Sequence, residues 1–588
     1  MKSLQCLRFF AFLSVLTIGA PALADSAPEA TSEAMDRLGD VDRHQITSDR
    51  GIVAADEAQA SAIGAQVLAD GGNAADAGVA ALLALNLSHP FASGLGGGGF
   101  CLYHEADDDQ THVIDYRETA PQQAHRDLFI VDGEARSDLA RHGGLAVATP
   151  GEPAGLWSLH GRFGHLQWED VVDPSIELAR SGARVSDTLA THLETLADDL
   201  EQRPALAALF QDDDGQWLDA GDLMVRDDLA RALTILRDDG VRPFYVGEIA
   251  DAIVDTVEAH DGILSQDDLA TYGVQRRQPI VADIGGHRIA SMPPPSSGGI
   301  ALVQAFQILD HLVDDHHQTL DASYRHLAIE ALKHAFADRA RWLGDTDFVD
   351  VPVDRLLSEE YAAELAQRVR RDATLDTDDY GTVAPDVESS GTAHLSVVDA
   401  DDNLLACTST INTRFGSMVL VEEYGLLLNN EMADFTIKPG EPNVFGLMGN
   451  EQNAVEPHKR PLSSMSPTLV FDDQGRPSAT LGASGGPTII SGTYFTLIDT
   501  LLGGLDPLTA ITADRLHHQW IPPQLFAEHD AIDALDQLRS WGHDIEIRPS
   551  YSAVQIIQRT DQGWIGVSDP RKGGIPAAPD APVDDDSH

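Results

Sequence analysis

Lysine, cysteine and long apolar stretches are scarce in this 588-residue chain, and each scarcity excludes something. The 39 Lys and Arg residues face 94 Asp and Glu residues, which gives a formal charge of −55. Binding to nucleic acid or to anionic lipid is disfavoured, because like charges would repel across the surface. Only five of these 39 basic residues are lysines. We therefore expect a surface suited to high salt, where screening weakens self-repulsion, with an ordinary acidic secreted protein as the simpler alternative.

Known metal and nucleotide motifs are also missing from the sequence. It contains no His-Glu-x-x-His helix and no Cys-x-x-Cys pair, so we expect no catalytic zinc. The glycine-rich run Gly94–Phe100 lacks the Lys-Ser/Thr end of a phosphate-binding loop and follows a predicted helix. We interpret it as a tight backbone passage packed against a neighbouring element.

The first 24 residues have the layout of an export signal. Lys2 and Arg8 precede the apolar run Phe9–Ile18, and small residues lead up to Ala24. This pattern predicts a cleaved secretory signal over residues 1–24 and a periplasmic or secreted protein. No later segment is long and apolar enough to span a membrane, so we expect the mature chain to be soluble.

The three cysteines are too few for a disulfide framework or a metal cluster. Removal of the signal would take Cys6 away. Cys101 and Cys407 each lie in an apolar, strand-like segment, so we expect two buried thiols. A single bridge between them is the alternative.

Hydrophobic periodicity separates the chain into a helix-rich part and a later strand-rich part. Apolar residues recur every three or four positions in Asp56–Asn86, Trp168–Ser181 and Tyr324–Leu343, which predicts helices. Alternating patterns predict strands over His394–Val398, Leu404–Asn412, Pro467–Phe471 and Ala553–Arg559. This distribution favours a layered α and β architecture, and the acidic tail 580–588 is predicted to be disordered.

Two of these strands are joined by a short polar turn centred on Asp401. Antiparallel pairing around that centre places Thr392 opposite Thr410. Two facing hydroxyls can exchange a hydrogen bond that orients both side chains. Taken alone, the hairpin favours two ordinary β-branched strand residues.

A set of short motifs, in order along the chain, resembles the gamma-glutamyltransferases, or glutathione hydrolases, of the N-terminal-nucleophile hydrolase superfamily. The resemblance runs from about Gly51 to the end of the folded chain. The motifs that carry it are Asp70–Ala77, Ser93–Phe100, Asp115–Pro121, Ser291–Gly299, Ala337–Arg339, Leu428–Phe435, Arg460–Pro467 and Gly485–Gly486.

The resemblance implies an α+β fold, a four-layer αββα sandwich, that cleaves itself. The precursor would cut the bond between Gly391 and Thr392, giving a large subunit of residues 25–391 and a small subunit of residues 392–588 that stay together as a heterodimer. Cleavage gives Thr392 a free α-amine, and the usual pKa of such an amine, about 7.7 to 8.0, suits a base near neutral pH. Nucleophile and base then belong to one residue, and the implied acyl transfer calls for neither a metal nor an organic cofactor.

The resemblance also implies the other catalytic groups. Thr410 matches the threonine that positions the nucleophile. Gly485 and Gly486 match the pair whose backbone N–H groups stabilise the oxyanion, and glycine leaves the approach to those groups open.

Substrate contacts follow from the same resemblance. Arg117 would bind the α-carboxylate of a γ-glutamyl group in bidentate fashion, assisted by Ser463 and Ser464. The residues that match the family's contacts to the α-ammonium are Asn412, Glu431 and Asp434. A site positive at one end and acidic at the other would select glutathione and related γ-glutamyl compounds, and pass the glutamyl group to water, amino acids or dipeptides.

Two other functions remain open at this stage. A cephalosporin acylase of the same superfamily branch would use Thr392 on a glutaryl amide that lacks the α-amino group. The acids Glu431 and Asp434 argue against it, because buried carboxylates without an ammonium partner are costly. An exported binding protein that keeps the fold without processing is the rival from another class.

Overall fold

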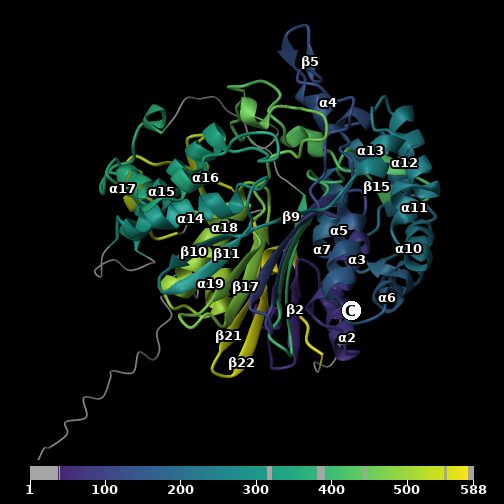
Figure 1. The fold of residues 1–588 in the computed structure, drawn as a ribbon, viewed down its shortest axis with the longest axis horizontal. Helices are drawn as coiled ribbons and strands as arrows, with labels where there is room; N and C mark the ends of the chain where they lie inside the picture. The colour runs from purple at the N-terminus through teal and green to yellow at the C-terminus, as the bar shows by residue number, and fades with distance from the viewer. Residues whose placement is uncertain are drawn as a thin grey trace, which may run out of the picture.

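The computed structural model describes residues 38 and 40–579, apart from 314–320, 381–390, 442, 444–445, 531 and 549–551. The predicted export signal and the predicted disordered tail lie outside these residues. Two sheets stand at the centre of the molecule (Figure 1). The first contains, in spatial order, β1 (Gln45–Ser48), β22 (Gly563–Ser568), β21 (Ala553–Thr560), β17 (Pro477–Ser484), β16 (Thr468–Phe471), β11 (His287–Ser291) and β10 (Ile280–Ile284).

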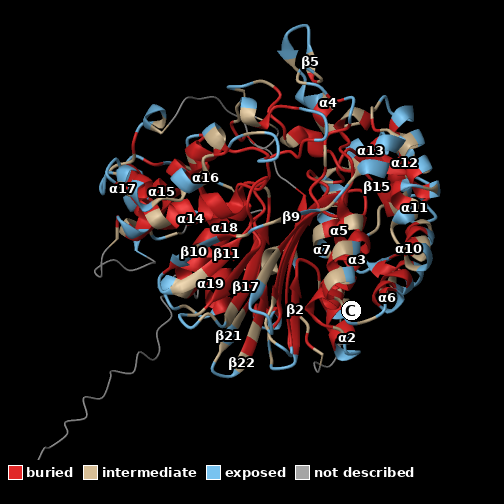
Figure 2. Cartoon of the chain, in the orientation of Figure 1, coloured by how far each residue is buried: buried red, intermediate tan, exposed pale blue. Residues whose placement is uncertain are grey.

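The second sheet packs face to face on the first. Its strands, in spatial order, are β2 (Gly51–Ala55), β12 (Thr392–Asp399), β13 (Leu404–Thr410), β3 (Gly98–Glu105), β4 (Gln110–Asp115) and β9 (Gln275–Arg277). Phe100 and Leu102 of this sheet share one apolar core with Ile289 and Leu481 of the other. Burial of both inner faces makes the sandwich stable, and Figure 2 shows the central strands as buried.

Helices cover the outer face of each sheet, which completes four layers (Figure 1). The first sheet is covered by α14 (Gly298–Asp310), α15 (Ala322–Trp342), α17 (Glu359–Ala366), α18 (Thr488–Leu497) and α19 (Pro507–Thr512). The second is covered by α2 (Ala58–Ala69), α3 (Ala74–Ser88), α5 (Glu152–Phe163), α6 (Trp168–Ser181), α10 (Asp227–Asp239) and α12 (Glu248–Ala259). The αββα sandwich expected from the resemblance is confirmed.

Shorter elements connect the layers. The remaining helices are α4 (Ser137–Arg141), α7 (Asp187–Thr195), α8 (Ala197–Glu201), α9 (Pro204–Ala207), α11 (Arg242–Tyr245), α13 (Gln266–Thr271), α16 (Val353–Leu356) and α20 (Leu535–Ser540). Short strand pairs include β5 (Ile130–Val131) with β6 (Glu134–Ala135), β7 (Ala183–Arg184) with β8 (Leu223–Met224), and β14 (Leu420–Val421) with β15 (Leu426–Leu427). A further small sheet contains β18 (Leu516–His517), β19 (Gln524–Ala527) and β20 (Asp544–Ile547).

The predicted helix over Asp56–Asn86 is in fact two helices. Gly71, with φ +95°, lies between α2 and α3 in a conformation that favours glycine. Asn73 then caps α3, and its side chain accepts hydrogen bonds from two backbone N–H groups in the first turn of that helix.

The interpretation of the glycine-rich run Gly94–Phe100 as a tight backbone passage is confirmed, because a Cβ on Gly97 would lie 2.0 Å from the carbonyl oxygen of Thr410.

Strands from both sides of the predicted cleavage point interleave. In the second sheet, β12 and β13 lie between β2 and β3; in the first, the run from β22 to β16 lies between β1 and β11. The segments before and after residue 391 therefore share both sheets and both cores. Neither segment could bury its apolar faces without the other.

The expectation of two separate buried thiols is wrong. Cys101 and Cys407 form a disulfide bond, with Cα atoms 4.2 Å apart. The pairing of β3 with β13 places the two residues directly opposite each other. Because 306 positions separate them along the chain, no local sequence pattern could reveal that these strands are neighbours.

Within the described part of the chain, no helix combines the length and the apolar character needed to cross a membrane.

Candidate active site

The threonine hairpin has the register that the sequence predicts. Thr392, the first residue of β12, lies opposite Thr410, the last residue of β13. Their Oγ1 atoms are 3.4 Å apart, and both side chains are buried. Thr410 Oγ1 also accepts a hydrogen bond from the backbone N–H of Asn412 at 2.8 Å. The hydroxyl of Thr410 is thus fixed by its own strand and can orient that of Thr392.

The same hydroxyl contacts the peptide bond that precedes Thr392. Thr410 Oγ1 donates to the carbonyl oxygen of Gly391 at 2.8 Å, and a donor there polarises the carbonyl toward attack. A Cβ on Gly391 would lie 2.8 Å from the carbonyl oxygen of Phe91 and 3.0 Å from that of Thr413. Glycine is therefore required here by close packing against backbone.

Lys572 is a site residue that no motif in the sequence indicates. It ends the short helix η8 (Pro570–Lys572), and its Nζ donates to the carbonyl oxygen of Thr392 at 2.9 Å. The same ammonium contacts Asp56 Oδ2 at 3.1 Å and Ser484 Oγ at 2.6 Å. Burial raises the pKa of Asp56 and the Lys572 charge opposes that rise. Only the fold brings these residues together, so no local pattern could find them.

The glycine pair lies where a strand becomes a helix. Gly485 and Gly486 have φ values of +127° and +62°, and they connect β17 to the N-terminus of α18. Backbone N–H groups at a helix start favour negative charge, which suits a developing oxyanion.

The segment Gly482–Gly486 also has the sequence Gly-x-Ser-x-Gly, a serine-hydrolase pattern. However, Ser484 is buried, its hydroxyl is engaged by Asp56 and Lys572, and it does not line the cleft that Thr392 lines.

All predicted catalytic and substrate-binding residues except Gly485 line one cleft of ≈ 340 Å³. Thr392, Thr410 and Gly486 lie on its wall together with the charged residues Arg117 and Asp434. The hydroxyl pair and the charged groups therefore face the same space. A substrate in the cleft could contact both at once.

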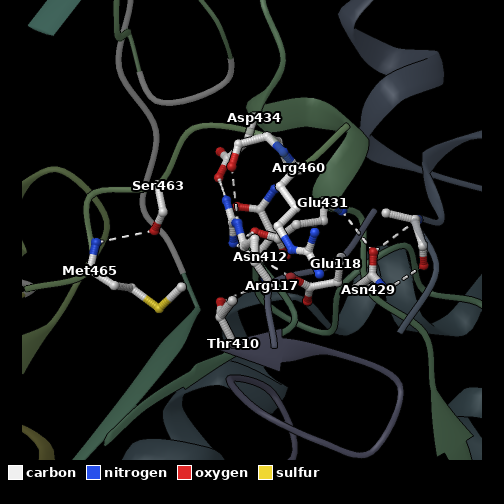
Figure 3. A network of polar contacts seen from close by, with 12 residues as sticks. Arg117, Glu118, Thr410, Asn412, Asn429, Glu431, Asp434, Arg460, Ser463 and Met465 are labelled. Atoms are coloured by element: carbon white, nitrogen blue, oxygen red, sulfur yellow. Dashed lines mark hydrogen bonds and ion pairs between the residues drawn. The ribbon is translucent and has the colours of Figure 1, made fainter. Parts of the chain in front are cut away.

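Arg117 is in direct contact with the acids that were expected at the opposite end of the site. Its Nη1 donates to Glu431 and its Nη2 to Asp434 (Figure 3). Glu118 Oε2 lies 3.7 Å from Nη1. The structure therefore does not have the expected separation into a positive and an acidic end, because opposite charges buried together pair with each other.

Burial sets the protonation of this cluster. Burial raises the pKa of Glu118 to about 7, and it also raises the pKa values of Glu431 and Asp434, although Arg117 opposes each rise. Burial works against the charge of Arg117, but the three acids raise its pKa, so it stays charged. Both oxygens of Glu118 and Glu431 Oε2 accept no hydrogen bond from the described residues. Of these two acids, Glu431 lines the cleft, so its Oε2 is suited to receive an ammonium group.

Arg339 is a second buried cation of the cleft, and it belongs to the motif Ala337–Arg339, for which the sequence alone indicates no role. Its Nε donates to Ser297 Oγ at 2.9 Å, and its Nη2 lies 3.5 Å from Ser464 Oγ. Burial lowers its pKa to about 10, while Asp434 opposes the shift. The cleft therefore holds two guanidiniums, those of Arg117 and Arg339, that can attract a carboxylate.

The remaining predicted residues also lie at this site. Asn412 has φ +78°, and its Nδ2 donates to the carbonyl oxygen of Asn430 at 2.9 Å, which leaves its Oδ1 as the acceptor. Ser463 Oγ accepts from the backbone N–H of Met465 at 3.1 Å (Figure 3), so its hydroxyl hydrogen can point to a ligand.

One group elsewhere has the composition of a metal site. His326, Glu330 and His543 bring their ligand atoms within 4.8 Å of one another in the buried core. Glu330 is already engaged by Lys333 Nζ at 3.0 Å and by the hydroxyls of Thr374 and Tyr380. The Nδ1 of His326 lies 2.8 Å from the Nε2 of His543. These contacts account for the cluster as a hydrogen-bonded core network.

Comparison with known proteins agrees with the geometry. The family model described as gamma-glutamyltranspeptidase matches residues 60–578. The glutathione hydrolase proenzyme of Escherichia coli (strain K12) is 38% identical over 567 residues, which cover 95% of this chain and 97% of that protein.

Solved structures share the fold. The cephalosporin acylase from Bacillus halodurans superposes with a TM-score of 0.80 at 25% identity, covering 96% of this chain and 99% of that one. The gamma-glutamyltranspeptidase of Helicobacter pylori gives a TM-score of 0.52 at 34% identity, covering 54% of this chain and 91% of that one. Since the family model covers most of the sequence, this chain belongs to the gamma-glutamyltranspeptidase family.

Proposed function

We propose that this protein is a self-processing γ-glutamyl hydrolase and transferase that acts on glutathione and related γ-glutamyl compounds. The observation that carries the proposal is the contact of Thr410 with both sides of one peptide bond: its hydroxyl donates to the Gly391 carbonyl and lies beside the Thr392 hydroxyl. Relatives named proenzymes support maturation by cleavage.

Maturation would begin with attack of Thr392 Oγ1 on the polarised Gly391 carbonyl. The C–N bond breaks as the C–O bond forms, so the Thr392 nitrogen takes up a proton and becomes the free α-amine, while Gly391 becomes esterified to the Thr392 hydroxyl. Water then hydrolyses this ester to the Gly391 carboxylate and the free Thr392 hydroxyl, which leaves two chains, residues 25–391 and 392–588. Because both chains contribute strands to both sheets, they stay associated as a heterodimer. Lys572 would hold the Thr392 carbonyl in place throughout.

Catalysis would then proceed by acyl transfer. The free amine of Thr392 takes the proton of its own hydroxyl, which attacks the γ-carbonyl of the substrate. The backbone N–H groups of Gly485 and Gly486 stabilise the oxyanion, and loss of one such donor typically costs about 3 kcal/mol. The amine product leaves, and water or an amino acid or dipeptide accepts the glutamyl group. No step requires a metal or a cofactor.

Recognition of the substrate would be an exchange of ion pairs. The α-carboxylate binds Arg117 in place of Glu431 and Asp434. The α-ammonium then binds these two acids and Asn412 in place of Arg117. Ser463 and Ser464 donate further hydrogen bonds to the carboxylate. A zwitterion satisfies both charges, so the exchange leaves no buried charge unpaired.

A cephalosporin acylase is the second candidate, favoured by the structural similarity to the Bacillus halodurans enzyme over nearly the whole chain. The argument from uncompensated acids is weaker than the sequence suggests, because Arg117 already compensates them. However, a glutaryl group would draw Arg117 away and leave the acids without a cation. The unprocessed binding protein remains the candidate from another class.

One comparison of substrates tests the proposal. Purified protein is assayed with γ-glutamyl anilide and with glutaryl anilide, each with and without glycylglycine as acceptor. We expect at least 100-fold faster anilide release from the γ-glutamyl compound, about 2.8 kcal/mol at 1.4 kcal/mol per tenfold, and stimulation by the acceptor. Faster release from the glutaryl compound would favour the acylase, and no release from either would favour the binding protein.

The proposed location is the periplasm or the exterior of the cell. The export pattern of residues 1–24 supports it, and so does the disulfide, because such bonds persist in oxidising compartments.

A further inference from the structure

The disulfide joins two strands that lie on opposite sides of the proposed cleavage point. Cys101 belongs to β3, in the part of the chain before Gly391, and Cys407 belongs to β13, after Thr392. The two residues are direct partners in the ladder, three residues along β13 from Thr410. Cutting the backbone at residue 391 would leave this bond intact.

We propose that in the mature enzyme the bond between Cys101 and Cys407 is an interchain disulfide that joins the large subunit to the small one. The inference rests on the proposed cleavage between Gly391 and Thr392. It goes further, because the two subunits would then be one covalent molecule and would not depend on packing alone to stay together.

The surroundings of the bond protect it. Both cysteines are fully buried on the face of the second sheet that packs under α3. The contact there is close, since a Cβ on Gly78 of α3 would lie 2.0 Å from Leu405 Cδ2, two residues from Cys407. The hydroxyl of Tyr116 lies 3.5 Å from Cys101 Sγ and occupies the space beside it. A reductant in solution can reach the sulfur atoms only after the helix and the sheet separate.

Formation of the bond does not require prior cleavage. Both cysteines are in one precursor chain, and the native pairing of β3 with β13 brings them together. Each thiol loses a proton, and the pair gives two electrons to the disulfide of an oxidised thiol oxidoreductase, which leaves as a dithiol. An exporting compartment supplies such an oxidant. The bond can therefore form before or after the chain cuts itself.

The tether changes what happens when the enzyme unfolds. Packing in both sheets holds the folded subunits together, but two unlinked chains would separate on unfolding. Linked chains keep an effective concentration on the order of 1 mM, which is about 10⁵ times a working concentration of 10 nM. Reassembly of the heterodimer then becomes independent of protein concentration.

A pair of denaturing gels tests the inference. Free thiols of the purified protein are blocked with N-ethylmaleimide in denaturant, and samples are run with and without reductant. We expect one band without reductant and two bands with it, corresponding to chains of 367 and 197 residues. Thiol labelling before reduction is expected to find no free thiol, and after reduction two, because the predicted signal removes Cys6.

Two variants provide the matched comparison. Cys407→Ser should show two bands even without reductant and one free thiol. Cys6→Ser, a change within the predicted export signal, should behave like the parent in both lanes.

The outcomes separate this inference from the proposed function. Two bands of the parent in both lanes, with two thiols labelled before reduction, would overturn the interchain disulfide and leave the cleavage standing. One band in both lanes would mean that no cleavage occurs, which contradicts the proposed maturation and removes the second chain that the bond is proposed to hold.

Discussion

The cleft has two regions that differ in how they are built. The threonine pair consists of neutral hydroxyls at the ends of β12 and β13, and strand register alone sets their geometry. The Arg117 cluster consists of buried charges held by loops and by the short helix η5 (Glu431–Asp434). In the first region position decides reactivity. In the second, we propose that charge balance decides which substrate is accepted, so damage to each region should produce a different kinetic signature.

The largest effect is expected at the threonine pair. Thr392→Ala removes the nucleophile, so the precursor should remain a single chain and turnover should fall by roughly 10⁴-fold or more. A reducing gel and an anilide assay measure both. Thr408→Ala is the matched control, because Thr408 lies on the same face of β13 and bonds to His394. Normal cleavage in Thr392→Ala would contradict the assignment.

Damage to the charged region should instead weaken binding. Arg117→Ala removes the proposed partner of the substrate carboxylate, and loss of a bidentate charged contact is worth about 2 to 3 kcal/mol, so KM should rise on the order of 100-fold. The change in kcat should be smaller. Arg136→Ala, at an exposed ion pair with Asp138, is the control and should leave KM unchanged. An unaltered KM in Arg117→Ala would show that this residue does not bind the carboxylate.

The two regions also differ in how far the sequence predicts them. The turn at Asp401 fixes a local register, so the pairing of Thr392 with Thr410 follows from counting residues. Arg117, Glu431 and Lys572 come from distant segments, and the sequence indicates their membership of the site only by resemblance, or not at all for Lys572. Their contacts depend on tertiary packing. The same limit explains the missed disulfide, whose strands are adjacent only in the folded sheet.

Lys572 connects the threonine region to the loop of the oxyanion. Lys572→Met removes its contacts with Thr392 and Ser484, and we expect kcat to fall about 10-fold with little change in KM. A nearby positive charge disfavours protonation of the Thr392 amine, so its loss should raise that amine's pKa and move the acidic limb of kcat/KM to higher pH. Lys572→Arg should return the acidic limb of kcat/KM to its position in the parent enzyme. An acidic limb that stays in place in Lys572→Met would limit the residue to a structural role.

The charged region should give binding its own pH dependence. With a pKa of about 7, Glu118 is protonated and neutral below pH 7 and ionised above it. The ionised form attracts the α-ammonium, so affinity for L-glutamate should rise as pH increases from 6 to 8, by up to about 10-fold. Titration calorimetry in Glu118→Gln should find a flatter profile, and an identical slope in variant and parent would remove Glu118 from recognition.

Salt should have the smallest effect, because neither region is exposed. At 1 M salt the Debye length is about 3 Å, which screens the acidic surface but hardly affects buried pairs. We expect kcat/KM in 2 M NaCl to stay within about 2-fold of its low-salt value. A steep loss would contradict the halophilic interpretation of the composition and leave the enzyme assignment unaffected.

The central claim is that the bond before Thr392 breaks itself and creates the catalytic residue. N-terminal sequencing of the smaller band from reduced, purified protein tests it most directly. The account predicts a sequence that starts Thr392-Ala393-His394. An active preparation whose chain is intact at this bond, or whose small band starts elsewhere, would contradict it.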